Sequence, residues 1–108
     1  MVLKKGVMGA LMLSVVNMAW GLDEESAASL ARKSGCMKCH GIDKKKDGPA
    51  FTEIARKYKG KADAEKKLIT QVTTNPKVKI DGNEEEHESL KSKDQAAVLN
   101  VVQWIMTR

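Results

Sequence analysis

The stretch Cys36-Met37-Lys38-Cys39-His40 decides how the rest of the chain is interpreted. Its form, C-x-x-C-H, is the attachment signature of a c-type haem. Two cysteines three residues apart can form thioethers with the two vinyl groups on one edge of a porphyrin, and the histidine that follows can offer an imidazole nitrogen to the iron. The sequence has two cysteines in all. It therefore predicts one covalently attached haem c, with Cys36 and Cys39 as the thioethers and His40 as the proximal iron ligand.

Two other chemistries share part of this pattern. C-x-x-C alone is typical of a thioredoxin-like dithiol, but that motif belongs to a βαβ unit, and no strand-like alternating run flanks Cys36. A zinc site is the second alternative. No second cysteine pair follows, and His87 is the only other histidine that could complete such a site. The histidine at the end of the motif favours haem attachment over both.

The first 21 residues are predicted to be a signal peptide. A positively charged start is followed by an apolar run over 7–16, and Ala19 and Gly21 supply small residues at the −3 and −1 positions of a cleavage site. We expect cleavage after Gly21, with no stable membrane insertion afterwards. A retained N-terminal anchor is the alternative. The apolar run is short for that, because a membrane-spanning helix needs about 20 apolar residues. The domain would then be residues 22–108, located in the periplasm, because bacteria attach haem covalently outside the cytoplasmic membrane.

The charge of the chain indicates a modestly basic surface. The formal net charge is +5 and the sequence pI is about 9.3. Removal of Lys4 and Lys5 with the signal peptide lowers the charge to +3. Base-stacking aromatic side chains are few, with Phe51, Tyr58 and Trp104 in the predicted domain, so a nucleic-acid partner is not expected.

Capping residues and apolar periodicity predict four helices in a single domain. The first begins after Asp23 and ends at Gly35, before the haem motif. A short helix covers 52–58 with Thr52 as its cap, and a third, capped by Asp63, runs to about residue 72. For the last helix, Ser92 and Gln95 read as a capping box. Its apolar positions recur at steps of three and four residues: Ala97, Val98, Val101, Val102 and Ile105.

A proline follows the haem motif at a specific distance. Pro49, in Gly48-Pro49-Ala50-Phe51, lies nine residues after His40. The arrangement resembles a small bacterial class I cytochrome c of the c-551/c-552 type. The resemblance implies an all-α class I cytochrome c fold, with three to five helices wrapped around one covalently bound haem. It also implies that the Pro49 carbonyl accepts a hydrogen bond from the second nitrogen of His40, which would orient the ring. A plain Gly-Pro turn is the alternative.

The second axial ligand departs from that family. Its members normally supply a methionine from the loop before the last helix, and here the loop, residues 75–91, contains none. His87 lies close to where that methionine would fall, so we expect it to be the distal iron ligand. A solvated histidine and a five-coordinate iron are alternatives. Weak ligation is another, and the candidates for it are Lys77, Lys79, Asn75 and Asn83.

Acidic residues surround His87, and their effect on it has two possible directions. Glu84, Glu85, Glu86 and Glu88 should favour the protonated imidazole, which cannot bind iron. A carboxylate hydrogen-bonded to the second ring nitrogen would instead raise the basicity of the ligand. With two imidazoles on the iron, the reduction potential should lie well below that of methionine-ligated relatives.

The function that these residues predict is single-electron transfer between periplasmic or membrane-bound redox proteins, without enzymatic activity. The alternative is a haem protein that binds or senses nitric oxide, carbon monoxide or oxygen at an open or weakly held distal site. A small peroxidase is disfavoured, because none of the three arginines lies near His87 in the sequence to assist O–O cleavage. Lysines near the haem motif could form a docking face at the haem edge, although a solvated basic face is an equally simple reading. They are Lys33, Lys38, Lys44, Lys45 and Lys46.

Overall fold

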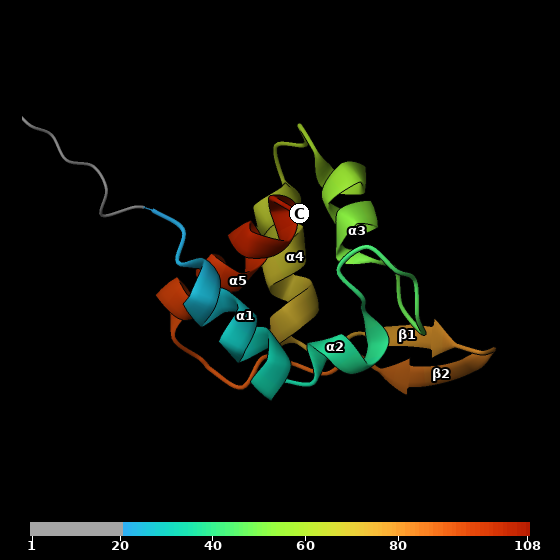
Figure 1. Ribbon diagram of the computed structural model, residues 1–108. Helices are drawn as coiled ribbons and strands as arrows, with labels where there is room; N and C mark the ends of the chain where they lie inside the picture. Colours follow the sequence, from blue (N-terminus) through green and yellow to red (C-terminus); the bar gives the residue numbers. More distant parts are fainter. Residues whose placement is uncertain (1–20) are drawn as a thin grey trace, which may run out of the picture.

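The structure, a computed structural model, describes residues 21–108, and the predicted signal peptide lies outside them apart from Gly21. In these residues the expected helical fold is confirmed, with five helices and one small hairpin that was not expected (Figure 1). No helix in the described part of the chain is long and apolar enough to cross a membrane. The elements are α1 (Glu24–Lys33), α2 (Cys36–Cys39), α3 (Phe51–Tyr58), α4 (Ala64–Thr73), β1 (Lys77–Ile80), β2 (Asn83–Glu86) and α5 (Gln95–Met106).

The core is built around α5, which packs against α1, α3 and α4. Val101 and Val102 on this helix are fully buried, as the three- and four-residue spacing of its apolar positions requires. Trp104 is also buried and meets Phe51, the first residue of α3, edge to face, with the ring centroids 5.5 Å apart. This edge-to-face contact is a favoured geometry for aromatic pairs. It joins the last helix to the segment that follows the haem motif.

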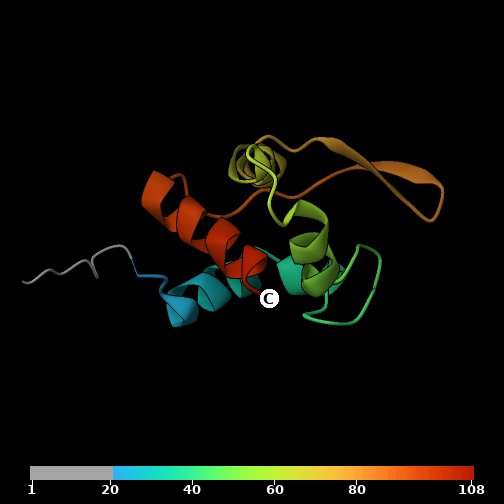
Figure 2. The same ribbon diagram turned by 90° about the horizontal axis from the view of Figure 1, so that it is seen from above.

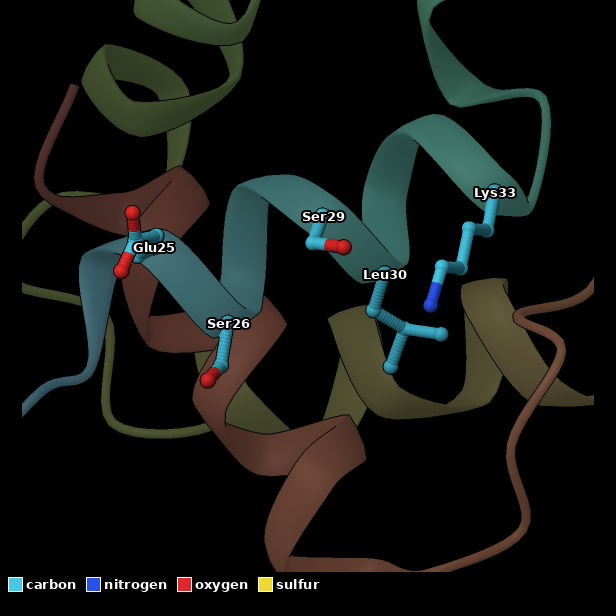
Figure 3. A pocket seen from close by; sticks show the side chains of 5 residues that line it. All are labelled: Glu25, Ser26, Ser29, Leu30 and Lys33. Atoms are coloured by element: carbon cyan, nitrogen blue, oxygen red, sulfur yellow. The ribbon is translucent and has the colours of Figure 1, made fainter.

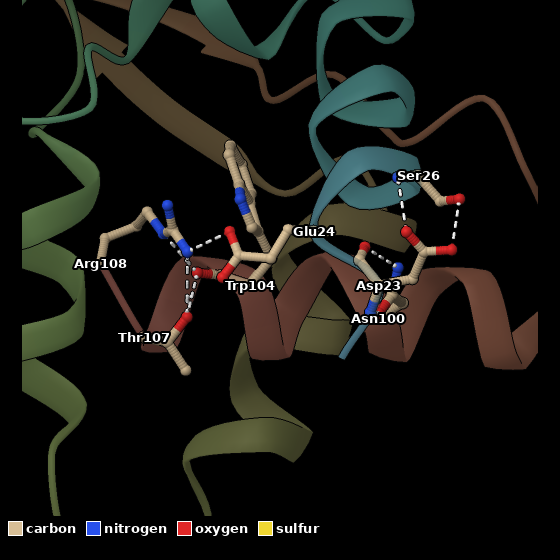
Figure 4. Close-up of polar contacts among 7 residues, drawn as sticks. All are labelled: Asp23, Glu24, Ser26, Asn100, Trp104, Thr107 and Arg108. Atoms are coloured by element: carbon tan, nitrogen blue, oxygen red, sulfur yellow. Dashed lines mark hydrogen bonds and ion pairs between the residues drawn. The ribbon is translucent and has the colours of Figure 1, made fainter. Parts of the chain in front are cut away.

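Polar contacts fix the crossing of α1 and α5 (Figure 4). Asp23 caps α1 by accepting a hydrogen bond from the backbone N–H of Ser26 at 3.0 Å, and this bond holds the pKa of the Asp23 carboxyl below its usual value. The Asn100 side chain, in the middle of α5, binds both backbone polar groups of Asp23, at 3.0 and 2.9 Å. Just past the C-terminal end of α5, the Arg108 guanidinium donates to the Glu24 carboxylate at 2.8 Å. The start of α1 is therefore anchored to the middle of α5 and to the residue that follows its C-terminal cap.

Two helix starts differ from the prediction. The cap of α5 is Asp94, whose side chain accepts from the backbone N–H of Ala97, while the Ser92 hydroxyl only accepts from the Asp94 N–H. The helix therefore begins two residues later than the capping box indicated. In contrast, α3 begins before Thr52. The N–H groups of Phe51 and Thr52 donate to carbonyls of the preceding loop, so no side-chain cap is needed.

The loop before α5 contains an antiparallel hairpin that the sequence analysis missed. Its register pairs Lys77 with Glu86 and Ile80 with Asn83. The two-residue turn, Asp81-Gly82, has positive φ at both positions, which is the geometry of the turns that match the twist of paired strands. Figure 2 shows the hairpin extending past the helices, at the end of the molecule where α2 and α3 lie.

Candidate functional site

The haem motif forms its own helical turn. Gly35 adopts a left-handed conformation, φ 83°, between α1 and α2, and this conformation favours glycine. Cys36 and Cys39 stand at the two ends of α2, one turn apart, so their thiols can reach the same side of that turn. Both thiols are free and partly buried, and burial raises the pKa of Cys36. The turn therefore presents two free thiols, one at each of its ends.

His40 leaves α2 with its ring held in one orientation. Its Nδ1 lies 2.6 Å from the Pro49 carbonyl oxygen. Because a carbonyl can only accept, Nδ1 carries the proton and Nε2 is the nitrogen with a free lone pair. The ring also stacks on Phe51, with centroids 5.2 Å apart and planes 18° apart. The loop closes where the Gly48 N–H donates to the Cys39 carbonyl at 2.7 Å. The contact between His40 Nδ1 and the Pro49 carbonyl is the one that the family resemblance implied.

Gly48 is a position where only glycine fits beside His40. A Cβ there would lie 2.8 Å from Cε1 and 3.1 Å from Nδ1 of the His40 ring. We expect Gly48→Ala to displace the ring, to change the optical spectrum of the haem protein, and to destabilise it by about 1–3 kcal/mol. The measurement is the Soret band together with thermal unfolding of the holoprotein.

Gly60→Ala is the matched control for that substitution. Gly60 has φ 76°, and nothing lies within 4 Å of its virtual Cβ. This variant should lose stability through backbone strain alone, with an unchanged Soret band. Equal spectra for the two variants would contradict the close approach at Gly48.

His87 lies opposite His40. The two ring centroids are 6.1 Å apart and the ring planes are inclined by 51°. The ring of His87 is half-buried, and its Nδ1 is buried without a hydrogen-bond partner. Burial, and then the nearby His40, lower the pKa of His87. Of the acidic run, Glu88 favours the protonated form as expected, but burial outweighs its effect. Glu84, Glu85 and Glu86 are exposed on β2, where water screens their charges.

The other candidates for weak ligation are positioned differently from His87. Successive residues of a strand point to opposite faces, so Lys77 and Lys79, both exposed, lie on the face away from the partly buried Val78. Asn83 is exposed at the start of β2. The side chain of Asn75 already donates to the backbone carbonyl of His87 at 2.7 Å.

The residues at this site fit a haem. An imidazole nitrogen binds a metal at roughly 2 Å, so two rings on one metal would have centroids about 6 Å apart. The observed 6.1 Å separation of the His40 and His87 rings is consistent with that spacing. The free Nε2 of His40, the unpartnered Nδ1 of His87 and two free thiols are the donors that the site offers.

The surface pocket in Figure 3 is unrelated to this site. It lies along one helix, α1, and contains neither cysteine nor histidine. Its lining residues are Glu25, Ser26, Ser29, Leu30 and Lys33.

A helical domain that carries C-x-x-C-H on its own turn, with a second histidine opposite the first, has the site of a protein that attaches haem covalently. The cytochrome c family profile matches residues 24–107, nearly all of the described chain. The chain therefore belongs to the cytochrome c family. It is a monohaem c-type cytochrome that binds one haem c through Cys36 and Cys39.

Comparisons with individual proteins agree with this assignment. The chain is 49% identical over 49 residues to cytochrome c2 of Rhodocyclus tenuis, covering 45% of the chain and 51% of the relative. It is 41% identical over 54 residues to cytochrome c-551 of Pseudomonas aeruginosa, covering 50% and 49% of the two. These alignments thus span about half the length of the curated relatives.

Solved structures match over more of the chain. The class 1 cytochrome MtoD from Sideroxydans lithotrophicus ES-1 is 50% identical, with a TM-score of 0.77, over 81% of this chain and 97% of that one. Cytochrome c552 of Nitrosomonas europaea is 29% identical, with a TM-score of 0.58, over 74% and 96%. The expected resemblance to class I cytochromes of the c-551/c-552 type is confirmed.

Proposed function

We propose that this cytochrome carries single electrons between redox proteins of the periplasm, and that His40 and His87 would both bind its haem iron. The observation that supports this most directly is the 6.1 Å separation of the two imidazole rings. The bound haem would supply reversible one-electron chemistry at its iron. An electron carrier needs the same ligands in both oxidation states, and two protein ligands provide that without a substrate pocket.

The chain's own residues have separate roles in this proposal. Cys36 and Cys39 would hold the haem through two thioether bonds. Pro49 and Phe51 orient the His40 ring, because one fixes the proton on Nδ1 and the other stacks on the ring face. The hydrogen bond to the Pro49 carbonyl also makes His40 a more basic ligand. His87, neutral because burial lowers its pKa, offers a free imidazole nitrogen.

Potentiometric titration of the haem protein tests this function. Thioether ligation raises the potential of a haem iron and imidazole ligation does not, so we expect a reduction potential below those of the methionine-ligated c-551 relatives. Axial ligands and their surroundings shift haem potentials over about 0.8 V, so the difference should exceed roughly 0.1 V. A potential within the range of those relatives, measured in the same buffer, would contradict bis-histidine ligation.

The docking face we propose is basic. Five exposed lysines lie around the haem motif and its loop: Lys33, Lys38, Lys44, Lys45 and Lys46. The Lys46 ammonium donates to the Met37 carbonyl at 2.8 Å, which holds this loop against α2. A positive surface beside the attachment turn would steer an anionic partner toward the haem.

Charge reversal tests the docking face with an anionic oxidant. In the triple variant Lys38→Glu, Lys44→Glu, Lys45→Glu, the rate of oxidation by ferricyanide should fall by about tenfold at low ionic strength. This loss of rate should shrink as salt screens the charges. The control is Lys57→Glu, Lys59→Glu, Lys61→Glu, which makes the same charge change around the far end of α3. If both triple variants slow the reaction equally, net charge explains the effect and the face has no special role.

A further inference from the structure

The β1–β2 hairpin ends at His87, and its ladder extends to that residue. Lys77 pairs with Glu86, so the next pair along the strands is Pro76 with His87. The His87 N–H donates to the Pro76 carbonyl at 2.8 Å. In an antiparallel pair of this kind the two residues normally exchange two hydrogen bonds. Proline has no N–H, so Pro76 cannot return the second bond.

Asn75 supplies the bond that Pro76 cannot make. Its side-chain Nδ2 donates to the His87 carbonyl at 2.7 Å. Both backbone polar groups of His87 are therefore bound by two consecutive residues, Asn75 and Pro76. Asn75 has φ 54°, in the left-handed region that few non-glycine residues adopt and that asparagine tolerates better than most.

The segment after His87 is also fixed to the helical domain. The Leu90 N–H donates to the Val72 carbonyl at 2.9 Å, and the Lys91 N–H donates to the buried Ser34 hydroxyl at 2.8 Å. These bonds hold the downstream side of His87, whereas the upstream side depends on the hairpin. An isolated two-stranded hairpin is only marginally stable in water. The bonds of Asn75 and Pro76 to His87 are thus the connection between the hairpin and a ring that faces His40.

The register of the hairpin also decides on which of its two faces the His87 side chain lies. Alternation along the strands places His87 on the same face as Val78 and Ile80, which are partly buried, whereas Lys77 and Lys79 lie on the exposed face. A slip by one residue would exchange these faces. Pairing of His87 with Asn75-Pro76 therefore carries this register one residue past β2 and keeps the imidazole on the partly buried face of the hairpin.

We propose that Asn75 is a positioning residue for the distal ligand: its side-chain amide replaces the N–H that Pro76 lacks, and so keeps the His87 backbone in the register that aims the ring at His40. This inference rests on the proposed function, in which His87 binds the iron. It assigns to the hairpin the role of holding that ligand in place, so that small molecules do not displace it.

The test measures how fast carbon monoxide binds to the reduced holoprotein, because this reaction requires His87 to leave the iron. In Asn75→Ala, we expect binding to be about tenfold faster, the factor that corresponds to the loss of one hydrogen bond. Asn75→Asp keeps the size of the side chain and its tolerance for positive φ, but a carboxylate cannot donate. Carbon monoxide should therefore bind to Asn75→Asp about as fast as to Asn75→Ala.

Asp81→Ala is the matched control. Asp81 has φ 51°, so alanine meets the same backbone strain there, at the far turn of the same hairpin. We expect its carbon monoxide rate to stay within twofold of the parent protein. Equal rates for Asn75→Ala and Asp81→Ala would overturn the positioning role, because strain in the hairpin would then explain both.

The ferric spectrum of the parent protein distinguishes a failure of the Asn75 role from a failure of His87 ligation. If the parent is low-spin with two imidazoles while the Asn75 variants bind carbon monoxide at the parent rate, only the role of Asn75 is wrong. If the parent is not ligated by two imidazoles, the proposed function fails and the positioning role fails with it. Thermal unfolding of each variant shows whether it is folded at the assay temperature, and Asn75→Asp serves if Asn75→Ala is not.

Discussion

Replacing His87 with alanine is expected to convert the ferric protein from low spin to high spin and to open its reduced form to carbon monoxide. The imidazole of His87 lies opposite His40 with a lowered pKa, so it is neutral near pH 7 and able to bind iron. Without it, His40 is the one histidine left in the sequence. Carbon monoxide should then bind at least a hundred times faster, since the population with an open site rises from a small fraction to nearly all molecules.

Two further variants define what that result means. Lys79→Ala, on the exposed face of the same hairpin, should leave spin state and carbon monoxide binding unchanged. His87→Met should restore a six-coordinate iron with the far-red band of sulfur ligation and a higher potential. A ferric His87→Ala protein that remains low-spin with two imidazoles would contradict the assignment of His87.

Replacing Cys36 and Cys39 together with alanine is expected to abolish covalent haem attachment and, with it, the folded state. A domain of this size buries a small core, and the haem would complete it. The measurements are haem staining after denaturing electrophoresis, and circular dichroism of the purified chain. We expect no covalent haem and little helical signal.

Met37→Ala is the control within the same turn. Met37 lies between the two cysteines and forms no bond to the haem in this account, and its backbone carbonyl, which binds Lys46, is kept. The variant should retain covalent haem and the helical signal. A double-cysteine variant that still folds with full helical content would show that the protein core of α1, α3, α4 and α5 is sufficient without the haem.

Most of the helical fold could be predicted because local signals and long-range packing agree. Asp23 caps α1 as expected, and the apolar spacing of α5 corresponds to its buried face. The predicted Ser92 cap was wrong because Asp94, two residues later, offers an equally good acceptor, and the sequence does not say which of them the chain will use. The predicted Thr52 cap was wrong for a different reason. The backbone N–H groups at the start of α3 donate to carbonyls of the preceding loop, so no side-chain cap is needed.

The hairpin was missed because its second strand, Asn83–Glu86, contains residues that are depleted in strands. Asp81-Gly82 was nevertheless a usable signal, since Asp-Gly between two short runs favours a two-residue hairpin turn. The roles of Gly48 and Asn75 could not be predicted. Each depends on a contact made across the fold, with the His40 ring in one case and the His87 carbonyl in the other.

The most direct test of the account is the spectrum of the purified holoprotein, with electron paramagnetic resonance of the ferric form and optical spectra of both oxidation states. Ligation by His40 and His87 predicts a low-spin ferric signal typical of two imidazoles, without the far-red band of sulfur ligation. A high-spin ferric signal would contradict it. The distal site would then be open, and binding of a small gas would replace electron transfer as the function to pursue.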